Sequence, residues 1–145
     1  MYQSILVPYD GSPHAQEALR VASELALDRH ATITLLNVPE FATARDELGR
    51  WTGAIPLDSD RAQYEQAALD RLKQAWETLD EAKAEVAYLV RWGRPAATIL
   101  AEAARLGVEA IVMGSRGLSD LRGLVVGSVS HKVTHAAKCH VVTVH

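Results

Sequence analysis

Two glycine-containing segments carry the clearest chemical signal in the sequence. Gly114-Ser115-Arg116-Gly117 follows an apolar run. After nine intervening residues comes Gly127-Ser128, which opens a segment compatible with a helix. Glycine lets backbone N–H groups approach an anion without a Cβ atom in the way. A helix N-terminus adds unpaired N–H groups and the positive end of the peptide dipole. Two such sets of donors suit a polyphosphate better than a single carboxylate, so the sequence predicts nucleotide binding.

A second polar segment, Pro8-Tyr9-Asp10-Gly11-Ser12, also follows an apolar run. Asp10 could accept hydrogen bonds from ribose hydroxyls or hold a metal ion on the phosphates. It could equally brace the turn that contains Gly11 and Ser12. Arg116 has two readings as well, as a phosphate contact or as a solvated loop cation.

The elements that must position these segments alternate along the chain. Buried strands are predicted by five short apolar, β-branched runs: Ile5–Val7, Ile33–Val38, Val86–Val90, Ala110–Met113 and Val141–Val144. Helical periodicity predicts four helices: one from Pro13 with Ser12 as N-cap, one over about Ser59–Leu79, one from Pro95 to Gly107, and one from Gly127 that ends before His140. Their core faces include Leu72, Ala75, Trp76 and Leu79 in the second helix, Ile99, Leu100, Ala103 and Leu106 in the third, and Val129, Val133, Ala136 and Ala137 in the fourth.

Alternating strands and helices predict an α/β fold, with a parallel sheet and helices on both of its faces. Ligands of such sheets bind beyond the carboxyl ends of the strands, where the winding direction reverses. If the first and fourth strands are neighbours at that point, Asp10 and the glycine turn face each other across one crevice. The segment Pro39–Asp58 has no clear period, and a loop of that length is usually either a functional flap or poorly ordered.

Composition places the chain among ordinary globular proteins. With 145 residues, 48% hydrophobic and 23% charged, one domain over residues 1–145 is expected. A net charge of −3 argues against nucleic-acid binding. The N-terminus does not resemble a signal peptide, and no apolar run approaches the length of a membrane span. We therefore expect a cytoplasmic protein that does not insert into membranes.

Familiar nucleotide-binding motifs do not match. The sequence contains no G-x-x-x-x-G-K-[ST] and no G-x-G-x-x-G after the first strand. The chain instead resembles the universal stress protein family over essentially its whole length. The resemblance is carried by 5–12 (ILVPYDGS), 35–38 (LLNV), 93–99 (GRPAATI), and by 112–129, which matches the G-x2-G-x9-G-[ST] signature of the ATP-binding branch. The chain departs from the family at Cys139-His140, where Cys-Pro is common.

The resemblance implies a single open-twisted sheet in the order 3-2-1-4-5, of the Rossmann-like, adenine nucleotide alpha hydrolase-like type. It also implies bound ATP and a homodimer formed by residues 140–145. The metal ion that Asp10 could hold on the phosphates would be Mg²⁺. Pro8 and Val38 would surround the adenine, Asp10 would lie by the sugar, and the glycines with Ser128 and Val129 would hold the phosphates. The complete set of implied nucleotide-binding residues is Pro8, Tyr9, Asp10, Val38, Met113, Gly114, Arg116, Gly117, Gly127, Ser128 and Val129.

Three functional hypotheses remain open at this stage. The first is a regulatory ATP-binding module of the stress response, whose nucleotide alters contacts with an unknown protein partner. The second is a slow ATPase or a nucleotidyl transferase, which is less favoured because the phosphate segment offers no lysine and no obvious general base apart from the distant Asp120 and His131. The third is a dimeric scaffold that the ligand only stabilises.

A few other residues invite a functional reading. His131, His135 and Cys139 recur every four residues, as a metal site would require. The helical wheel places both histidines opposite the apolar face, so solvent-facing histidines near a helix C-terminus are the better interpretation. Trp76 and Trp92 are expected to pack, while Trp51 in the irregular segment could form a lid or contact a partner chain.

Overall fold

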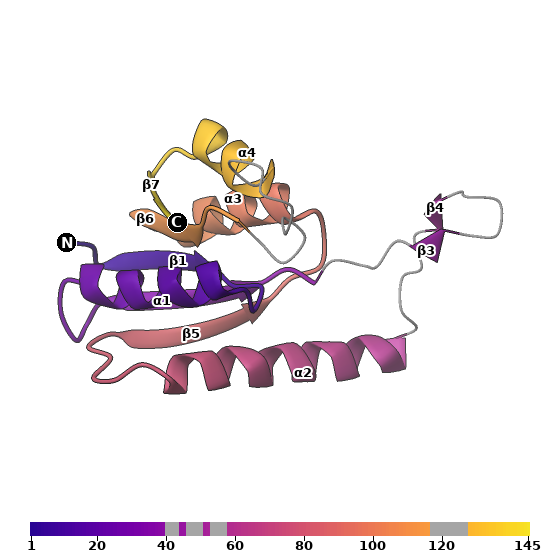
Figure 1. Ribbon diagram of the computed structural model, residues 1–145, viewed down its shortest axis with the longest axis horizontal. Coiled ribbons are helices and arrows are strands. Elements are labelled where there is room, and N and C mark those ends of the chain that lie inside the picture. Colours follow the sequence, from indigo (N-terminus) through magenta and orange to yellow (C-terminus); the bar gives the residue numbers. More distant parts are fainter. Residues whose placement is uncertain (40–43, 46–50, 53–57, 117–127) are drawn as a thin grey trace.

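A five-stranded sheet forms the centre of the protein (Figure 1). The computed structural model describes residues 1–39, 44–45, 51–52, 58–116 and 128–145 of the 145-residue chain. The strands of the sheet are β1 (Ser4–Pro8), β2 (Thr32–Asn37), β5 (Glu85–Val90), β6 (Ala110–Gly114) and β7 (His140–Val144). They lie in the order β5-β2-β1-β6-β7, and every neighbouring pair is parallel. When only the strands of this sheet are numbered along the chain, this order is 3-2-1-4-5, so the predicted order is confirmed.

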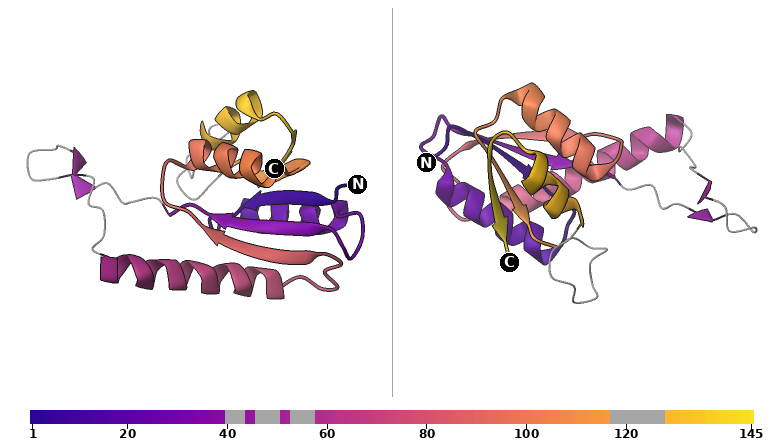
Figure 2. Two further views of the ribbon diagram at one scale, coloured as in Figure 1. Left: turned by 180° about the vertical axis from the view of Figure 1, so that it is seen from behind. Right: turned by 90° about the horizontal axis from the view of Figure 1, so that it is seen from above.

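Two pairs of helices cover the two faces of this sheet. Helices α1 (Pro13–Leu25) and α2 (Asp58–Glu77) lie on one side, and α3 (Pro95–Leu106) and α4 (Ser128–Ala136) lie on the other (Figure 2). Each pair builds its own core against the sheet: Leu19 and Leu72 pack in the first, Ile99 and Val133 in the second. The expected α/β architecture is thereby confirmed.

The strand sequences explain why both faces are covered. Ile5 and Val7 belong to the core under α1 and α2, whereas Leu6 belongs to the core under α3 and α4. Successive side chains of a strand point to opposite faces, so a continuous apolar run must be buried twice. The side chains of all three residues are fully buried. The edge strands β5 and β7 are only partly buried.

Local signals set the helix ends that frame the strand ends. Ser12 Oγ accepts a hydrogen bond from the N–H of Ala15 at 3.1 Å, and Pro13 occupies the first turn of α1. This is the predicted N-cap. Helix α3 ends at Gly107, which has a φ of 63° and the left-handed conformation that glycine adopts without a steric penalty.

Some predicted helix boundaries were wrong. Helix α2 ends at Glu77, two residues before Leu79, because the N–H groups of Thr78 and Leu79 bond to carbonyls three residues back and tighten the last turn. Leu106 and Ala136, both predicted on core faces, are exposed. Each is the last residue of its helix, whereas the nearby Val108 and Ala137 do pack against the core under α3 and α4.

The segment Pro39–Asp58 contains regular structure that the sequence reading missed. Strands β3 (Ala44–Arg45) and β4 (Trp51–Thr52) form a separate antiparallel pair, in which Arg45 lies opposite Trp51. Two-residue strands are too short to produce a periodic pattern. The interpretation of the Trp51 side chain as a lid or partner contact falls outside what the structure describes.

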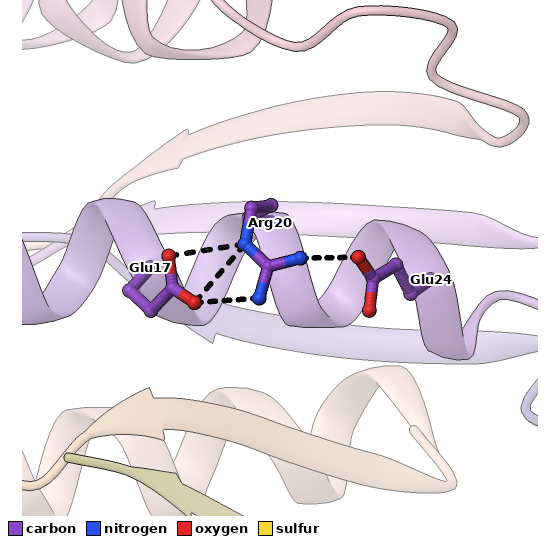
Figure 3. Close-up of polar contacts among 3 residues, drawn as sticks. All are labelled: Glu17, Arg20 and Glu24. Atoms are coloured by element: carbon purple, nitrogen blue, oxygen red, sulfur yellow. Dashed lines mark hydrogen bonds and ion pairs between the residues drawn. The ribbon is translucent and has the colours of Figure 1, made fainter.

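The outer face of α1 carries charged residues that contribute little to the fold. Arg20 bonds to Glu17 through Nε at 3.0 Å and also pairs with Glu24 (Figure 3). These side chains are about half exposed, and exposed ion pairs are worth little because water screens them.

Within the described residues, no helix combines the length and apolar character needed to cross a membrane.

Trp92 does more than pack, although packing alone was expected. Its Nε1 donates a hydrogen bond to Glu65 Oε1 at 2.6 Å, and Arg61 lies over the indole ring, 5.2 Å from its centroid. Trp92 follows β5, whereas Arg61 and Glu65 belong to α2. These contacts fasten the first half of α2 to the carboxyl end of the sheet. Trp76 packs against the core under α1 and α2 as predicted.

We expect Glu102→Gln to lower the free energy of unfolding at pH 7 by about 1 kcal/mol. Glu102 is buried on α3, bonding to Arg105 at 2.6 Å and to Arg91 at 3.1 Å. The hydrogen bond from Arg105 is the main reason that the pKa of Glu102 lies below its ordinary 4.5. A depressed carboxyl pKa gives stability that is present above pH 4.5 and is lost as the pH falls through the folded-state value.

Urea unfolding of the wild type and of Glu102→Gln at pH 7 and at pH 3 tests this. The difference between the two proteins should shrink at pH 3. A difference that stays constant with pH would mean that the charge on Glu102 contributes nothing.

Candidate functional site

The central strands β1 and β6 pair only over their first halves in the described structure. Their register joins Ile5 to Ala110 and Leu6 to Ile111, whereas β1 and β2 pair at five successive positions. The chain leaves β1 toward β2 on one side and reaches β6 on the other, so the winding reverses here. Open α/β sheets bind ligands beyond the carboxyl ends of their strands at this point.

A pocket of about 590 Å³ lies at these strand ends. Most of the predicted site residues that the structure describes line it: Pro8, Tyr9, Asp10, Val38, Met113, Gly114, Arg116 and Val129. The pocket therefore brings together residues 9–11, which follow β1, and residues 115–116, which follow β6. Ser128, the first residue of α4, is exposed and is not among the lining residues. Gly117 and Gly127 lie outside the described residues.

The pocket walls combine apolar surface with a few charges. Apolar walls come from the strand ends and from helices α3 and α4: Pro8, Leu36, Val38, Pro95, Ile99, Met113 and Val129. Charged lining residues within the described part of the chain are Asp10, Arg71 and Arg116. Apolar walls with few polar groups are typical of sites for small organic molecules, and two cations favour an anionic one.

Asp10 braces the turn that follows β1. Its Oδ1 accepts a hydrogen bond from the N–H of Ser12 at 2.9 Å, the bond of an Asx-turn. The structural reading of Asp10 is therefore confirmed. The residue is nevertheless exposed and lines the pocket, so a ligand bound there could reach it.

Gly114 is needed where α1 crosses the end of β6. A Cβ atom at this position would lie 2.7 Å from the Cβ of His14 and 3.0 Å from its carbonyl carbon. It would also approach the N atom of Ala15 to 3.2 Å. Real Cβ atoms do not come as close as 2.7 Å to a neighbouring Cβ, and the two backbone contacts would also be tight. The first requirement for glycine here is therefore helix packing.

Asn37 and Tyr9 close the ends of β1 and β2. Asn37 Nδ2 donates to the carbonyl oxygen of Tyr9 at 2.8 Å, which fixes the orientation of the amide, because the opposite orientation would bring two oxygens together. Asn37 Oδ1 is buried and has no hydrogen-bond partner in the described structure. A buried acceptor without a donor therefore lies behind the pocket wall.

The Tyr9 side chain points toward α1. Its hydroxyl donates to Gln16 Oε1 at 2.8 Å, and its ring packs against the core under α1 and α2. Burial, and secondly the charge of Asp10, raise the pKa of Tyr9 above its ordinary value of 10.0. The phenol is therefore neutral at physiological pH, and Tyr9 borders the pocket as an uncharged residue.

Sequence reasoning missed several lining residues. Tyr64 and Arg71 come from one side of α2, seven residues apart, and nothing in their spacing distinguishes them from solvated helix residues. Ser115 and Ser130 lie beside the residues of the glycine signature. Asn37 offered a weak signal, as a polar residue at the end of an apolar strand.

The histidines of α4 lie away from this pocket. His131 and His135 are exposed, as predicted, and their ring centroids are 4.3 Å apart. Cys139 is half-buried, and burial raises the pKa of its thiol. Among the described residues, no three His, Cys, Asp or Glu side chains gather in an arrangement that could hold a metal ion.

Comparison with known proteins identifies the family of this chain. The model of the universal stress protein family matches residues 1–145. The chain is 33% identical over 147 residues to the universal stress protein YxiE of Bacillus subtilis (strain 168), covering 99% of both chains. It is 37% identical over 150 residues to a universal stress protein of Thermus aquaticus, again covering 99% of both.

Solved structures share the fold. Universal stress protein UspA from Lactobacillus plantarum superposes with a TM-score of 0.71 at 28% identity, covering 99% of this chain and 98% of that one. Two universal stress proteins solved with nucleotides also share it: one in complex with cAMP, at a TM-score of 0.64 and 23% identity, and one from Archaeoglobus fulgidus in complex with dAMP, at 0.60 and 24%. They cover 99% of this chain and 97% and 98% of their own. From the family match and the close relatives together, this chain belongs to the universal stress protein family.

Proposed function

We propose that this protein binds ATP in the pocket at the carboxyl ends of β1, β2 and β6 and acts as a regulatory module of the stress response. The observation that carries the proposal is the pocket itself, which joins apolar walls, Asp10 and Arg116 at the point where the sheet reverses. Universal stress proteins of the same fold bind cAMP and dAMP, which supports an adenine nucleotide.

The pocket residues fit the parts of such a ligand. Pro8 and Val38 are apolar surfaces suited to the faces of an adenine ring. The exposed carboxylate of Asp10 suits ribose hydroxyls. The phosphates would meet Arg116 and the N-terminal end of α4. Mg²⁺ would then neutralise the remaining phosphate charge.

Binding without efficient turnover is the form of the proposal that the pocket favours. Phosphoryl transfer needs a group that orients the nucleophile and cations that stabilise the transition state. Neither a lysine nor a histidine is among the described lining residues. The nucleotide therefore has a regulatory role in this proposal. The protein acts in the cytoplasm, and ATP changes the contacts that it makes with a protein partner.

The free edge of β7 supports a homodimer as part of this proposal. β7 ends the described sheet, and Val142 and Val144 are only partly buried there. An unpaired edge strand offers backbone donors and acceptors that a second copy can satisfy. Sedimentation equilibrium of the purified protein should give twice the mass of one chain, and a monomer at micromolar concentration would contradict the dimer.

Identification of the nucleotide that copurifies with the protein tests the binding proposal. Freshly purified protein is denatured, and the released small molecules are separated by ion-exchange chromatography. We expect ATP at a substantial fraction of one mole per mole of protein. Stripped protein should then bind added ATP in calorimetry, more tightly with Mg²⁺ than without, and should release phosphate only slowly. Absence of both released nucleotide and ATP binding would contradict the proposal.

A further inference from the structure

Ser115, the residue after β6, is held rigidly to the sheet. Its N–H donates to the carbonyl oxygen of Val144 at 2.8 Å, and Ser115 is 2% exposed. The preceding residue, Gly114, lies against the backbone of α1. The carbonyl of Ser115 is therefore a fixed point at the edge of the pocket, tied to β7 on one side and to α1 on the other.

Ser130, in the first turn of α4, bonds to this fixed point. Its Oγ donates to the carbonyl oxygen of Ser115 at 3.0 Å, across a separation of fifteen residues in the chain. Ser130 is 2% exposed, and both serines line the pocket. The hydroxyl thus fastens the beginning of α4 to the segment that follows β6.

This bond differs from the usual behaviour of a hydroxyl on a helix. Serine and threonine within helices commonly bond to a carbonyl of the preceding turn, and Thr134 of the same helix does so, donating to the carbonyl of Ser130 at 2.7 Å. The Ser130 hydroxyl reaches a different element. The first turn of a helix presents N–H groups that suit an anion, so the position of this turn of α4 decides where those donors point.

We propose that Ser130 is a positioning residue of the nucleotide site. Its hydroxyl sets the distance between the first turn of α4 and Ser115. This inference rests on the proposed function. In the proposed complex the first turn of α4 lies on the phosphate side of ATP. Loss of the bond from Ser130 to Ser115 should therefore weaken the contacts with the phosphates. The adenosine part would meet Pro8, Val38 and Asp10, which lie at or just after the ends of β1 and β2 and not on α4.

The experiment compares ATP with adenosine by calorimetry, on the wild type, Ser130→Ala and Ser130→Thr. Loss of one hydrogen bond to a buried carbonyl predicts about tenfold weaker ATP binding by Ser130→Ala. Adenosine binding should stay within about twofold of the wild type. Ser130→Thr keeps the hydroxyl and should restore ATP binding. Thr134→Val is the matched control, because it removes a hydroxyl from α4 that does not bond to Ser115, and it should leave both affinities unchanged.

Ser130→Cys provides a second route if Ser130→Ala folds poorly. It keeps the shape of the side chain with a larger terminal atom, and its thiol is a weak donor, so it should show the same loss for ATP alone. Equal weakening of ATP and adenosine, or unchanged ATP binding, in the Ala and Cys variants would overturn the inference. If the wild type binds neither ligand, the proposed function itself fails, and the two failures are thereby distinguished.

Discussion

Replacing Gly114 with alanine should lower the free energy of unfolding by about 2 kcal/mol, the cost of forcing an extra methyl group into a packed contact. The new Cβ would lie 2.7 Å from the Cβ of His14 and 3.0 Å from its carbonyl carbon, so α1 must shift away from β6. Urea unfolding measures the loss.

Two companion variants separate the contact with α1 from other effects of losing glycine. Gly11→Ala places a Cβ in open space at a φ of 84°, so its cost is that of backbone strain alone, about 1 kcal/mol. In a His14→Gly background, the nearest clash of the alanine at position 114 disappears, and the penalty should shrink. If the penalty at position 114 is the same with and without the His14 side chain, that side chain is not the cause.

Replacing Asp10 with alanine should weaken ATP binding roughly 30-fold, the loss expected when a hydrogen bond to a charged group is removed. The carboxylate is exposed in the pocket, and its Oδ1 also accepts from the N–H of Ser12. Alanine removes the proposed ribose contact and the turn together. Calorimetric titration with ATP on the stripped protein gives the affinity.

Asp10→Asn distinguishes these two contributions. Asparagine keeps an oxygen that can accept from Ser12 and removes the negative charge, so the turn should survive and the loss of affinity should stay below about tenfold. Wild-type affinity in both variants would limit Asp10 to its structural role. Equal losses in both would mean that the charge, and not the turn, sets its contribution.

The fold could be predicted from the sequence because its strands and helices have clear periods. Runs such as 5–7 and 110–113 are apolar at every position, which predicts strands covered on both faces, and Ser12 and Gly107 mark helix ends by chemistry that acts locally. The errors fall where tertiary packing decides. Leu106 continues the apolar period of its helix and is nevertheless exposed at the helix end, and no local pattern encodes that.

The site was predictable to the extent that it lies at strand ends. Pro8, Asp10 and Gly114 follow apolar runs directly, so parallel pairing brings them to one edge of the sheet. Tyr64 and Arg71 reach the pocket only because α2 is fastened over the end of β5, a contact between segments far apart in the chain.

Gly114 and Asn37 show a different limit of the sequence. The sequence predicts that Gly114 contacts the phosphates, but a Cβ atom at this position would collide with α1. A glycine required by packing looks the same in a sequence as one required by a ligand. The unpartnered oxygen of Asn37 depends on the orientation of one amide, which the carbonyl of Tyr9 decides.

The most direct test of the central claim is a crystal structure of the protein grown with saturating ATP and Mg²⁺. We predict the adenine between Pro8 and Val38, the ribose hydroxyls within hydrogen-bond distance of Asp10, and the phosphates at Arg116 and the first turn of α4. Density for ATP at any other place on the molecule, or an empty pocket at these strand ends, would contradict the account.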